Sequence, residues 1–397
     1  MLVPNFLYGT SQGSIIPIVP LFAHQLGSSL ATAALVAAML PLGQWAFNIP
    51  SGWLVGRFGE RRTMYFGAVI AATGAVVCWA APTIAVLGIG VLVVGAAAAV
   101  FTLARQTYVT VAVSPVFRGR AMSLLGGANR AGVMVGPFLT AMVIRLADDT
   151  RTAFVVAVTA SLTIIVLLRL LPGDPTAEDA VDPKAATNDA GRVGIRATFR
   201  TRYDVLLRVG TATGLLNFMR TCRQIIVPLV GVTLGLHPAQ VALVVGIGAV
   251  LEFAFFYPGG LIMDRFGRLW TGVPSMLMFA VSHAVLAVAA ELVDPVAWYV
   301  GASLVMAVGN GMTSGFVAAI GSDLADQSAP AAFLGVWRSI TDLGPASAPL
   351  AISGLTGVFS LAIATGSMTA VAVTGAGMLL RYVPRYLPSR KKSAAEL

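Results

Sequence analysis

The stretch Gln44–Arg62, QWAFNIPSGWLVGRFGERR, decides the fold because the chain contains it twice. The second copy is Glu252–Trp270, EFAFFYPGGLIMDRFGRLW, which begins 208 residues later. The same offset matches several prolines, glycines and arginines: Pro20 with Pro228, Gly27 with Gly235, Pro50 with Pro258, Gly52 with Gly260, Arg57 with Arg265, Phe58 with Phe266 and Gly59 with Gly267. A repeat this long predicts two homologous halves. In a membrane protein it indicates a transporter whose substrate lies between the halves, near the middle of the bilayer.

The composition predicts an all-α membrane protein. Hydrophobic residues make up 57% of the chain and charged residues 11%, whereas soluble domains carry roughly 25% charged residues. Apolar runs of about 20 residues recur, each long enough to cross a bilayer of about 30 Å as a helix, and we expect about twelve of them. We therefore expect a six-helix half at 1–172, a cytoplasmic linker at 173–205, a second six-helix half at 206–386 and a cytoplasmic tail at 387–397.

The distribution of arginine predicts the orientation. Positive charges gather in alternate short loops, such as the one at 57–62 and its repeat at 265–268, while the opposite loops hold almost none. The positive-inside rule then places both termini and the linker in the cytoplasm. The net charge of +9 is spread over these loops without a basic patch rich in aromatic residues, so we expect no nucleic-acid partner. Cys78 and Cys222 lie in apolar runs and indicate no disulfide framework.

With these residues in view, the chain resembles the major facilitator superfamily (MFS) over essentially its whole length. The loop between the second and third spans of that family carries G-x-L-x-D-R-x-G-R-[KR]. Residues 52–62 fit this pattern except at Gly56 and Glu60, and 260–268 keep its aspartate and arginines. The resemblance implies the MFS fold, with about twelve transmembrane helices in two pseudo-symmetric halves of six.

The repeated loop has a physical reading of its own. Glycine allows close helix approach, and arginine and aspartate at helix ends can pair across the cytoplasmic face. Such pairs would hold that face shut and break when the halves rock; the alternative is that the arginines only anchor the topology. The predicted gating residues are Gly52, Arg57, Gly59, Arg61, Gly260, Asp264, Arg265, Gly267 and Arg268.

A second motif resembles one found in drug-exporting branches of the superfamily. Gly132, Gly136 and Pro137 in the fifth span match the antiporter motif, although Thr140 and Ala141 replace its next glycine pair. On this partial match we expect resemblance to the bacterial drug:proton antiporter branch, and export as the direction of transport.

Charged residues form a layer inside the predicted spans. Ionisable residues in a membrane are costly and are functional candidates by default. Arg220 lies 12 residues past Arg208, which is about 18 Å at 1.5 Å per helical residue. Similar estimates bring five spans to this depth, and we call their charged residues the charged belt: Arg105, Arg130, Arg220, Arg223, Glu252, Arg338 and Asp342.

The charged belt holds five arginines against two carboxylates. A surplus of guanidinium groups suits an anionic substrate; alternatively, the arginines are bonded to helix carbonyls or to the two carboxylates. The predicted substrate-binding residues are Arg220, Arg223, Asn217, Gln224, Arg105, Arg130, Gln12 and Arg338. Glu252 and Asp342 are the proton-coupling candidates, unless Arg338 keeps Asp342 ionised. His283, a lone histidine of the ninth span, is expected to pack.

These observations predict a secondary active transporter of the bacterial plasma membrane, working by alternating access. The first hypothesis is proton-coupled efflux of a small amphipathic or drug-like compound; the alternative is a carrier of an organic anion, a carboxylate or phosphate, bound by the belt arginines. A membrane enzyme would need a nucleophile–base pair or a metal cluster, and the sequence offers neither, nor a P-loop. A non-transporting receptor is the remaining alternative. We expect no cofactor, no metal and a monomer.

Overall fold

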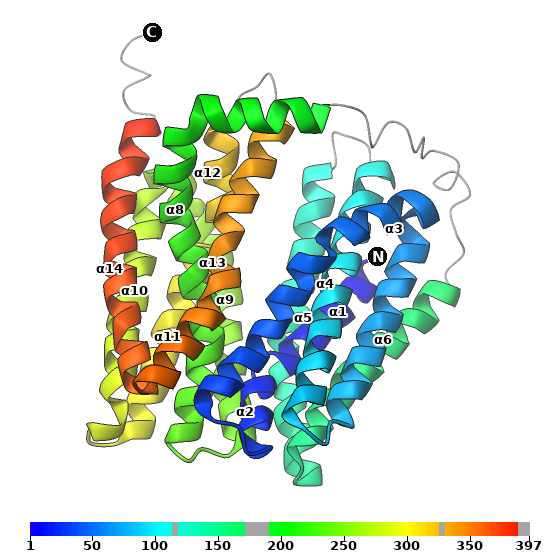
Figure 1. Cartoon of the computed structure of the whole chain (residues 1–397), viewed down its shortest axis with the longest axis vertical. Coiled ribbons are helices and arrows are strands. Elements are labelled where there is room, and N and C mark those ends of the chain that lie inside the picture. The colour runs from blue at the N-terminus through cyan, green and yellow to red at the C-terminus, as the bar shows by residue number, and fades with distance from the viewer. Residues whose placement is uncertain (113–117, 171–189, 325–329, 388–397) are drawn as a thin grey trace. The chain divides into compact units, whose positions relative to one another are not determined.

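The computed structural model describes residues 1–112, 118–170, 190–324 and 330–387 (Figure 1). The first half contains α1 (Leu2–Ile15), α2 (Ile18–Gln25), α3 (Leu30–Trp79), α4 (Ile84–Ala112), α5 (Arg118–Ala147), the 3-10 helix η1 (Thr150–Thr152) and α6 (Ala153–Leu170). The second half contains α8 (Ala190–Thr233), α9 (Pro238–Phe266), α10 (Leu269–Val288), the 3-10 helix η2 (Ala289–Glu291), α11 (Pro295–Met312), α12 (Phe316–Leu324), α13 (Pro330–Val358) and α14 (Leu361–Tyr386). No strand occurs among these described residues, so the all-α prediction is confirmed.

The helices correspond to the predicted spans. Within the described part of the chain, ten stretches are long and apolar enough to cross a membrane. The seventh and eleventh predicted spans fall in α8 and α13, which are not among those ten. These two helices carry several belt residues, Arg220 and Arg223 in α8 and Arg338 and Asp342 in α13, whose charge lowers the mean hydropathy. The two spans outside those ten are therefore the ones that carry two belt residues each.

Two compact units divide the chain. The first comprises Met1–Asn188 and Gly235–Gly246, and the second comprises Asp189–Leu234 and Ile247–Leu397. Within the first unit, α4 and α6 each lie against α3 (Figure 1). Within the second, α8 packs against α13 and α14, and α10 packs against α11 and α14.

Backbone geometry repeats with the sequence. Gly27 and Gly235 have φ of 86° and 71°, and Gly59 and Gly267 have φ of 76° and 104°. A positive φ is strained for every residue with a Cβ, which is why glycine stands at these four turns. The turn at Gly59 is the single non-helical residue inside α3. The expected loop at 57–62 is therefore a sharp kink between two helices.

The linker and tail lie largely outside the described residues. Helical structure resumes at Ala190, inside the predicted linker, and continues through a kink at Arg202 into the seventh span. The second six-helix half was predicted to begin at 206, so α8 begins 16 residues earlier than predicted. The predicted tail is described only at its first residue, Leu387.

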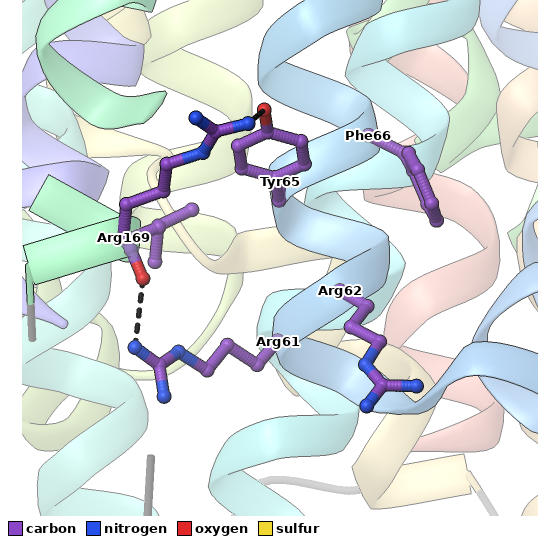
Figure 2. Close-up of a pocket in the computed structure, with 6 residues that line it drawn as sticks. Arg61, Arg62, Tyr65, Phe66 and Arg169 are labelled. Carbon is purple, nitrogen blue, oxygen red and sulfur yellow. Dashed lines mark hydrogen bonds between the residues drawn. The ribbon is translucent and has the colours of Figure 1, made fainter. Parts of the chain in front are cut away.

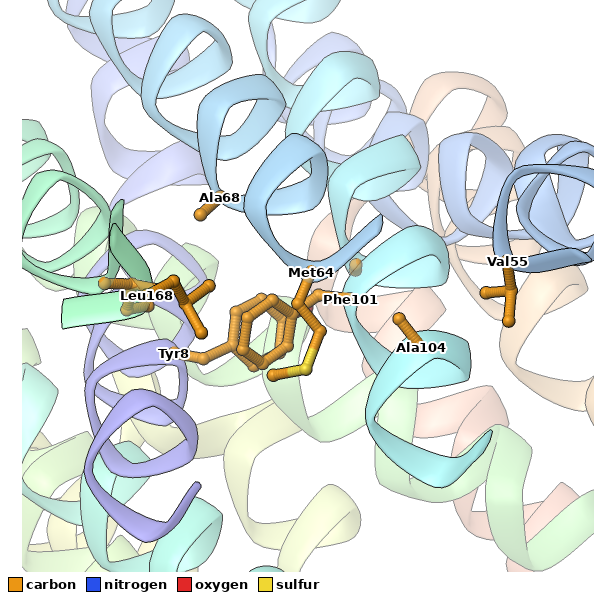
Figure 3. Packing of buried hydrophobic residues seen from close by; sticks show 9 residues of the cluster. Tyr8, Val55, Met64, Ala68, Phe101, Ala104 and Leu168 are labelled. Atoms are coloured by element: carbon orange, nitrogen blue, oxygen red, sulfur yellow. The ribbon is translucent and has the colours of Figure 1, made fainter. Parts of the chain in front are cut away.

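Buried side chains of the first unit form a core between α1, α3, α4 and α6 (Figure 3). The rings of Tyr8 and Phe101 stack with centroids 4.3 Å apart, and Met64 and Leu168 close around them. Lipid tails are as apolar as these residues, so van der Waals packing stabilises the contact in a membrane. The stack fixes α1 against α4, where the candidate site residues of this unit lie.

Glycines bring α1 and α5 into direct backbone contact. A Cβ added to Gly132 would lie 2.0 Å from the carbonyl oxygen of Phe6, and one added to Gly136 would lie 2.6 Å from that of Thr10. The second unit repeats the contact between α13 and α8, where a Cβ on Gly344 would lie 2.3 Å from the carbonyl oxygen of Gly214. Gly344 stands 208 residues after Gly136. The glycines of the antiporter-like motif, with Pro137 beside them in α5, thus serve helix packing.

Candidate substrate and proton site

The clearest polar cluster of the second unit joins α8, α9 and α11. Arg223 of α8 forms an ion pair with Glu252 of α9. The second oxygen of Glu252 accepts a hydrogen bond from the Asn310 amide of α11 at 2.6 Å. The Arg223 and Glu252 side chains are 13% and 22% exposed. The structure therefore brings together two predicted residues, Arg223 and Glu252, and adds Asn310 to them.

Arg220 lies one helical turn before Arg223 and makes different contacts. Its guanidinium donates to the backbone oxygen of Thr313 and, at 2.9 Å, to the Thr313 hydroxyl. A further hydrogen bond of 3.3 Å runs from Arg220 to the Asn217 side-chain oxygen. Ser275 of α10 lies 3.4 Å from the Thr313 hydroxyl. Arg220 therefore ties α8 to the end of α11 through neutral acceptors.

The first unit holds a related link between α1, α4 and α5. Arg105 of α4 donates to the side-chain oxygen of Asn5 at 2.5 Å, and the Asn5 amide donates to the backbone oxygen of Leu125. Asn5 is fully buried. Gln12, one of the predicted residues, instead donates to the Tyr8 hydroxyl at 3.0 Å. Arg105 and Gln12 thus both form hydrogen bonds with residues of α1.

In both units an arginine links the first span of the unit to its fourth span, but the arginine comes from a different span in each unit. Thr313 stands 208 residues after Arg105, and Arg220 stands 208 residues after Gln12. In the first unit the arginine belongs to the fourth span and bonds to the first span. In the second unit it belongs to the seventh span, which matches the first, and bonds to the tenth, which matches the fourth. Both units therefore have a hydrogen bond between these two spans, but the span that donates in one unit accepts in the other.

The remaining predicted site residues lie on α5, α8 and α13. Arg130 lies in α5 and is half-buried. Gln224 is exposed on α8, whereas Asn217 is half-buried on that helix. Arg338 and Asp342 lie four residues apart on α13, and both are exposed. His283 is fully buried and its ring nitrogen lies 2.7 Å from the backbone oxygen of Phe279. It packs inside α10, as expected.

Ion pairs hold the repeated turn of the second unit. Arg268 donates to Asp264 at 2.8 Å and to Asp323 of α12 at 2.9 Å. The bond to Asp323, and then the bond to Asp264, raises the pKa of Arg268 above its ordinary value. Asp323 lies in the last turn of α12. Gly267 supplies the positive φ that places Arg268 at the start of α10.

The repeated turn of the first unit has aromatic and backbone contacts. Gly56 stands where the second copy has Asp264. Arg57 lies over the rings of Trp53 and Phe58, at 5.3 and 5.8 Å from their centroids. Arg61 donates to the backbone oxygen of Leu168 in α6 at 2.7 Å.

The remaining gating candidates are one arginine and three glycines of the two repeated turns. Arg265 lies 5.4 Å from the Phe266 ring, which repeats the contact of Arg57 with Phe58. Gly52 lies inside α3, and Gly260 lies inside α9 with open space where a Cβ would be. Gly59 forms the kink already described. The matched arginines therefore lie against matched phenylalanines.

Sequence reasoning missed the neutral partners of the belt. Asn5, Asn310 and Thr313 bond to Arg105, Glu252 and Arg220. Asn310 had a detectable signal, since an amide side chain inside an apolar span is rare and tends to face other helices. Thr313 also had one, because the repeat offset matches it to Arg105.

The match to a known family covers both halves of the repeat. A family model described as Major Facilitator Superfamily matches residues 1–221 and 209–396. The chain belongs to the Major Facilitator Superfamily. MFS membership makes it a transporter-family protein rather than an enzyme, with the multi-pass architecture expected above. No finding assigns it to the drug:proton antiporter branch.

Individual relatives of this MFS chain are distant. The galactose-proton symporter of Escherichia coli (strain K12) is 23% identical over 171 residues, which are 43% of this chain and 37% of that protein. The match thus spans less than half of either chain. A POT family transporter in complex with a thioalcohol-conjugated peptide has a TM-score of 0.77 at 12% identity, over 97% of this chain and 96% of that one. The xylose transporter XylE from E. coli, partially occluded and inward open, has a TM-score of 0.71 at 15% identity, over 96% and 97%. At these identities the structures share the fold.

Proposed function

We propose that the chain is a proton-coupled secondary active transporter in which Glu252 carries the proton. The Arg223–Glu252–Asn310 cluster carries this proposal. It places a carboxylate inside a predicted membrane span, with an arginine and an amide on neighbouring helices. Ionisable residues at such positions mark substrate and proton pathways.

The cluster suggests how proton and substrate exchange. Ionised Glu252 holds Arg223 in the pair. A proton on Glu252 removes the negative charge, and with it most of the attraction to the guanidinium. Arg223 then has an uncompensated charge, which is costly away from water. A substrate carboxylate or phosphate would satisfy it, because the guanidinium fork matches both groups.

The substrate class that this arrangement fits best is a small organic anion or zwitterion. Arg105 donates to the neutral oxygen of Asn5, so this contact leaves its positive charge in place. Arg338 adds a third positive charge to those of Arg223 and Arg105, and it lies four residues before Asp342 on α13. The belt therefore favours solutes with a negative group over uncharged ones.

Efflux of an amphipathic, drug-like compound is the second candidate. It rests on Gly132, Gly136 and Pro137, the partial antiporter motif. The packing of α5 against α1 gives these glycines a role that suits import and export equally. The named relatives, a galactose-proton symporter and peptide transporters, add sugars and peptides to the compounds that need testing. We place the transporter in a bacterial plasma membrane as a monomer with both termini cytoplasmic.

The test measures proton movement in proteoliposomes that contain the full chain. The panel holds monocarboxylates and dicarboxylates, dipeptides, galactose and a cationic dye. We expect an anion or zwitterion to move protons with the wild-type protein and not with Glu252→Gln. Glu291→Gln, at an exposed carboxylate of η2, is the matched control and should keep wild-type coupling.

The outcomes separate the alternatives. Proton movement driven only by the dye would favour the efflux candidate and reject the anion. Proton movement driven only by galactose would reject both charged substrate classes. Substrate equilibration without proton movement in the wild type would reject the role of Glu252.

A further inference from the structure

A basic pocket of about 330 Å³ lies between α3 and α6, and none of its lining residues belongs to the charged belt (Figure 2). Arg61, Arg62 and Arg169 line it together with Tyr65, Phe66 and Leu168. None of these six lining residues carries a carboxylate. The pocket lies next to the Gly59 kink, at the end of α3 and α6 that the positive-inside rule assigns to the cytoplasm.

The contacts inside the pocket hold two of its arginines in place. Arg169 donates to the Tyr65 hydroxyl at 2.7 Å, and its guanidinium lies 5.2 Å from the centre of the Tyr65 ring. Arg61 donates to the backbone oxygen of Leu168 at 2.7 Å. Figure 2 shows the Arg61 and Arg169 side chains on the α6 side of α3 and Arg62 pointing to the other side. All three arginines line the pocket, and two of them, Arg61 and Arg169, donate to neutral oxygens on its α6 side.

An exposed apolar stripe leads from the pocket along each helix. The stripe on α3 comprises the exposed residues Arg62, Phe66, Val69, Thr73 and Val76, and the stripe on α6 comprises the exposed residues Val155, Thr159, Leu162, Val166 and Arg169. Both sets follow steps of three and four residues, which is one face of a helix. Each stripe ends at an arginine of the pocket.

The two threonines in these stripes are compatible with contact to hydrocarbon. The Thr73 hydroxyl donates to the backbone oxygen of Val69 at 2.9 Å, and the Thr159 hydroxyl donates to that of Val155 at 2.9 Å. Each hydroxyl is therefore satisfied inside its own helix, as a lipid-facing surface requires.

We propose that this pocket binds the phosphate of an anionic phospholipid headgroup, with the acyl chains along the apolar stripes. A guanidinium fork matches phosphate oxygens, and basic pockets at the cytoplasmic side of membrane helices recognise anionic headgroups. The stripes distinguish a lipid from a free anion, because only a lipid has chains to cover them. A lipid held there bridges α3 and α6 and stabilises the first unit.

The experiment measures thermal unfolding of the full chain in detergent during titration with dioleoyl-phosphatidylglycerol. Parallel titrations use dioleoyl-phosphatidylcholine and inorganic phosphate. The test variant is Arg62→Gln/Arg169→Gln. The matched control, Arg381→Gln/Arg385→Gln, removes two exposed charges from α14 at the end predicted to be cytoplasmic.

We expect phosphatidylglycerol to raise the unfolding temperature of the wild type and the control, and the zwitterionic lipid to have little effect. The test variant should need roughly 25-fold more phosphatidylglycerol, about fivefold per arginine. Equal weakening of both variants would show attraction by net charge alone and overturn the proposal. Stabilisation by inorganic phosphate that matches the lipid and depends on Arg62 and Arg169 would assign the pocket to a free anion and overturn the lipid.

If the test variant is less stable without lipid, Tyr65→Phe provides the second measurement. It removes only the hydroxyl that orients Arg169. An affinity for phosphatidylglycerol reduced severalfold, with wild-type stability in detergent alone, supports the site, and an unchanged affinity contradicts it.

Discussion

Arg105 and Thr313 occupy matching positions of the repeat, 208 residues apart, and take opposite roles, donor and acceptor, in hydrogen bonds that join corresponding pairs of spans. Arg105 donates to Asn5 of the first span, whereas Thr313 accepts from Arg220 of the seventh. Each unit therefore has one arginine between its first and fourth spans, but on different helices. The polar links are equivalent in place and distinct in chemistry, so equivalent substitutions in the two units should differ in effect.

Arg220→Lys should lower the unfolding temperature although it keeps the charge. The Arg220 fork reaches Thr313 and Asn217 together, and an ammonium group is a compact point charge. Loss of one or two hydrogen bonds should cost about 1–3 kcal/mol. Thermal unfolding in detergent measures it, with Arg385→Lys on the exposed end of α14 as the control. Wild-type stability of Arg220→Lys would show that the fork geometry does not matter.

Arg223→Gln should destabilise the protein more than the double variant Arg223→Gln/Glu252→Gln does. The single change leaves the Glu252 carboxylate without its ion pair, and breaking a buried pair costs about 3–5 kcal/mol. The partial exposure of both side chains reduces that cost. A double-mutant cycle on unfolding temperature measures the coupling. Additive effects of the two single variants would contradict an interaction between these side chains.

Gly59→Ala should destabilise the first unit through backbone strain alone. Gly59 has φ 76° and ψ 168°, a region that is almost restricted to glycine and costs other residues about 1–3 kcal/mol. A Cβ there would meet no atom within 4 Å. Gly301→Ala in α11, also without a neighbour within 4 Å, is the control and should be neutral or stabilising. Equal unfolding temperatures for both variants would argue against the kink.

Gly132→Ala should separate α1 from α5. The new Cβ would overlap the backbone oxygen of Phe6, and overpacking costs about 1–3 kcal/mol. Gly126→Ala lies on the same helix with nothing within 4 Å and is the matched control. Thermal unfolding and transport by the two variants give the comparison. If Gly126→Ala lowered stability as much as Gly132→Ala, helix propensity and not the contact would set the effect.

Arg268→Gln should lower stability by the same amount at every pH from 6 to 9. The pKa of Arg268 is raised by Asp323 and Asp264, so its contribution is complete below the ordinary arginine pKa and falls only at strongly alkaline pH. The loss should be at most about 1 kcal/mol, because Asp264 is 72% exposed. Unfolding temperatures across this pH range test the sign. A loss that shrinks between pH 6 and 9 would contradict it.

The fold could be predicted from the sequence because the repeat and the apolar runs depend directly on backbone geometry. Gly27, Gly59, Gly235 and Gly267 matched in sequence and share positive φ in the structure. The limits of α8 were harder, because helical structure starts at Ala190 within a polar segment that an apolar pattern does not mark.

Only part of the candidate site could be predicted from the sequence. Charge in an apolar span made Arg223 and Glu252 visible, but their pairing depends on which faces of α8 and α9 meet. Asn310 and Asp323 were missed for the same reason, since their importance comes from partners 58 and 55 residues away. The antiporter-like glycines show the opposite case, in which a motif suggested a function and the structure gives a packing role.

The contact of α1 with α5 limits how the first unit can deform. The glycines there leave no layer of side chains between the two backbones, so no change of rotamer can absorb relative movement of the helices. A shift of α1 along its axis would drive peptide groups of one helix into those of the other. A conformational cycle should therefore carry α1 and α5 together as one rigid pair.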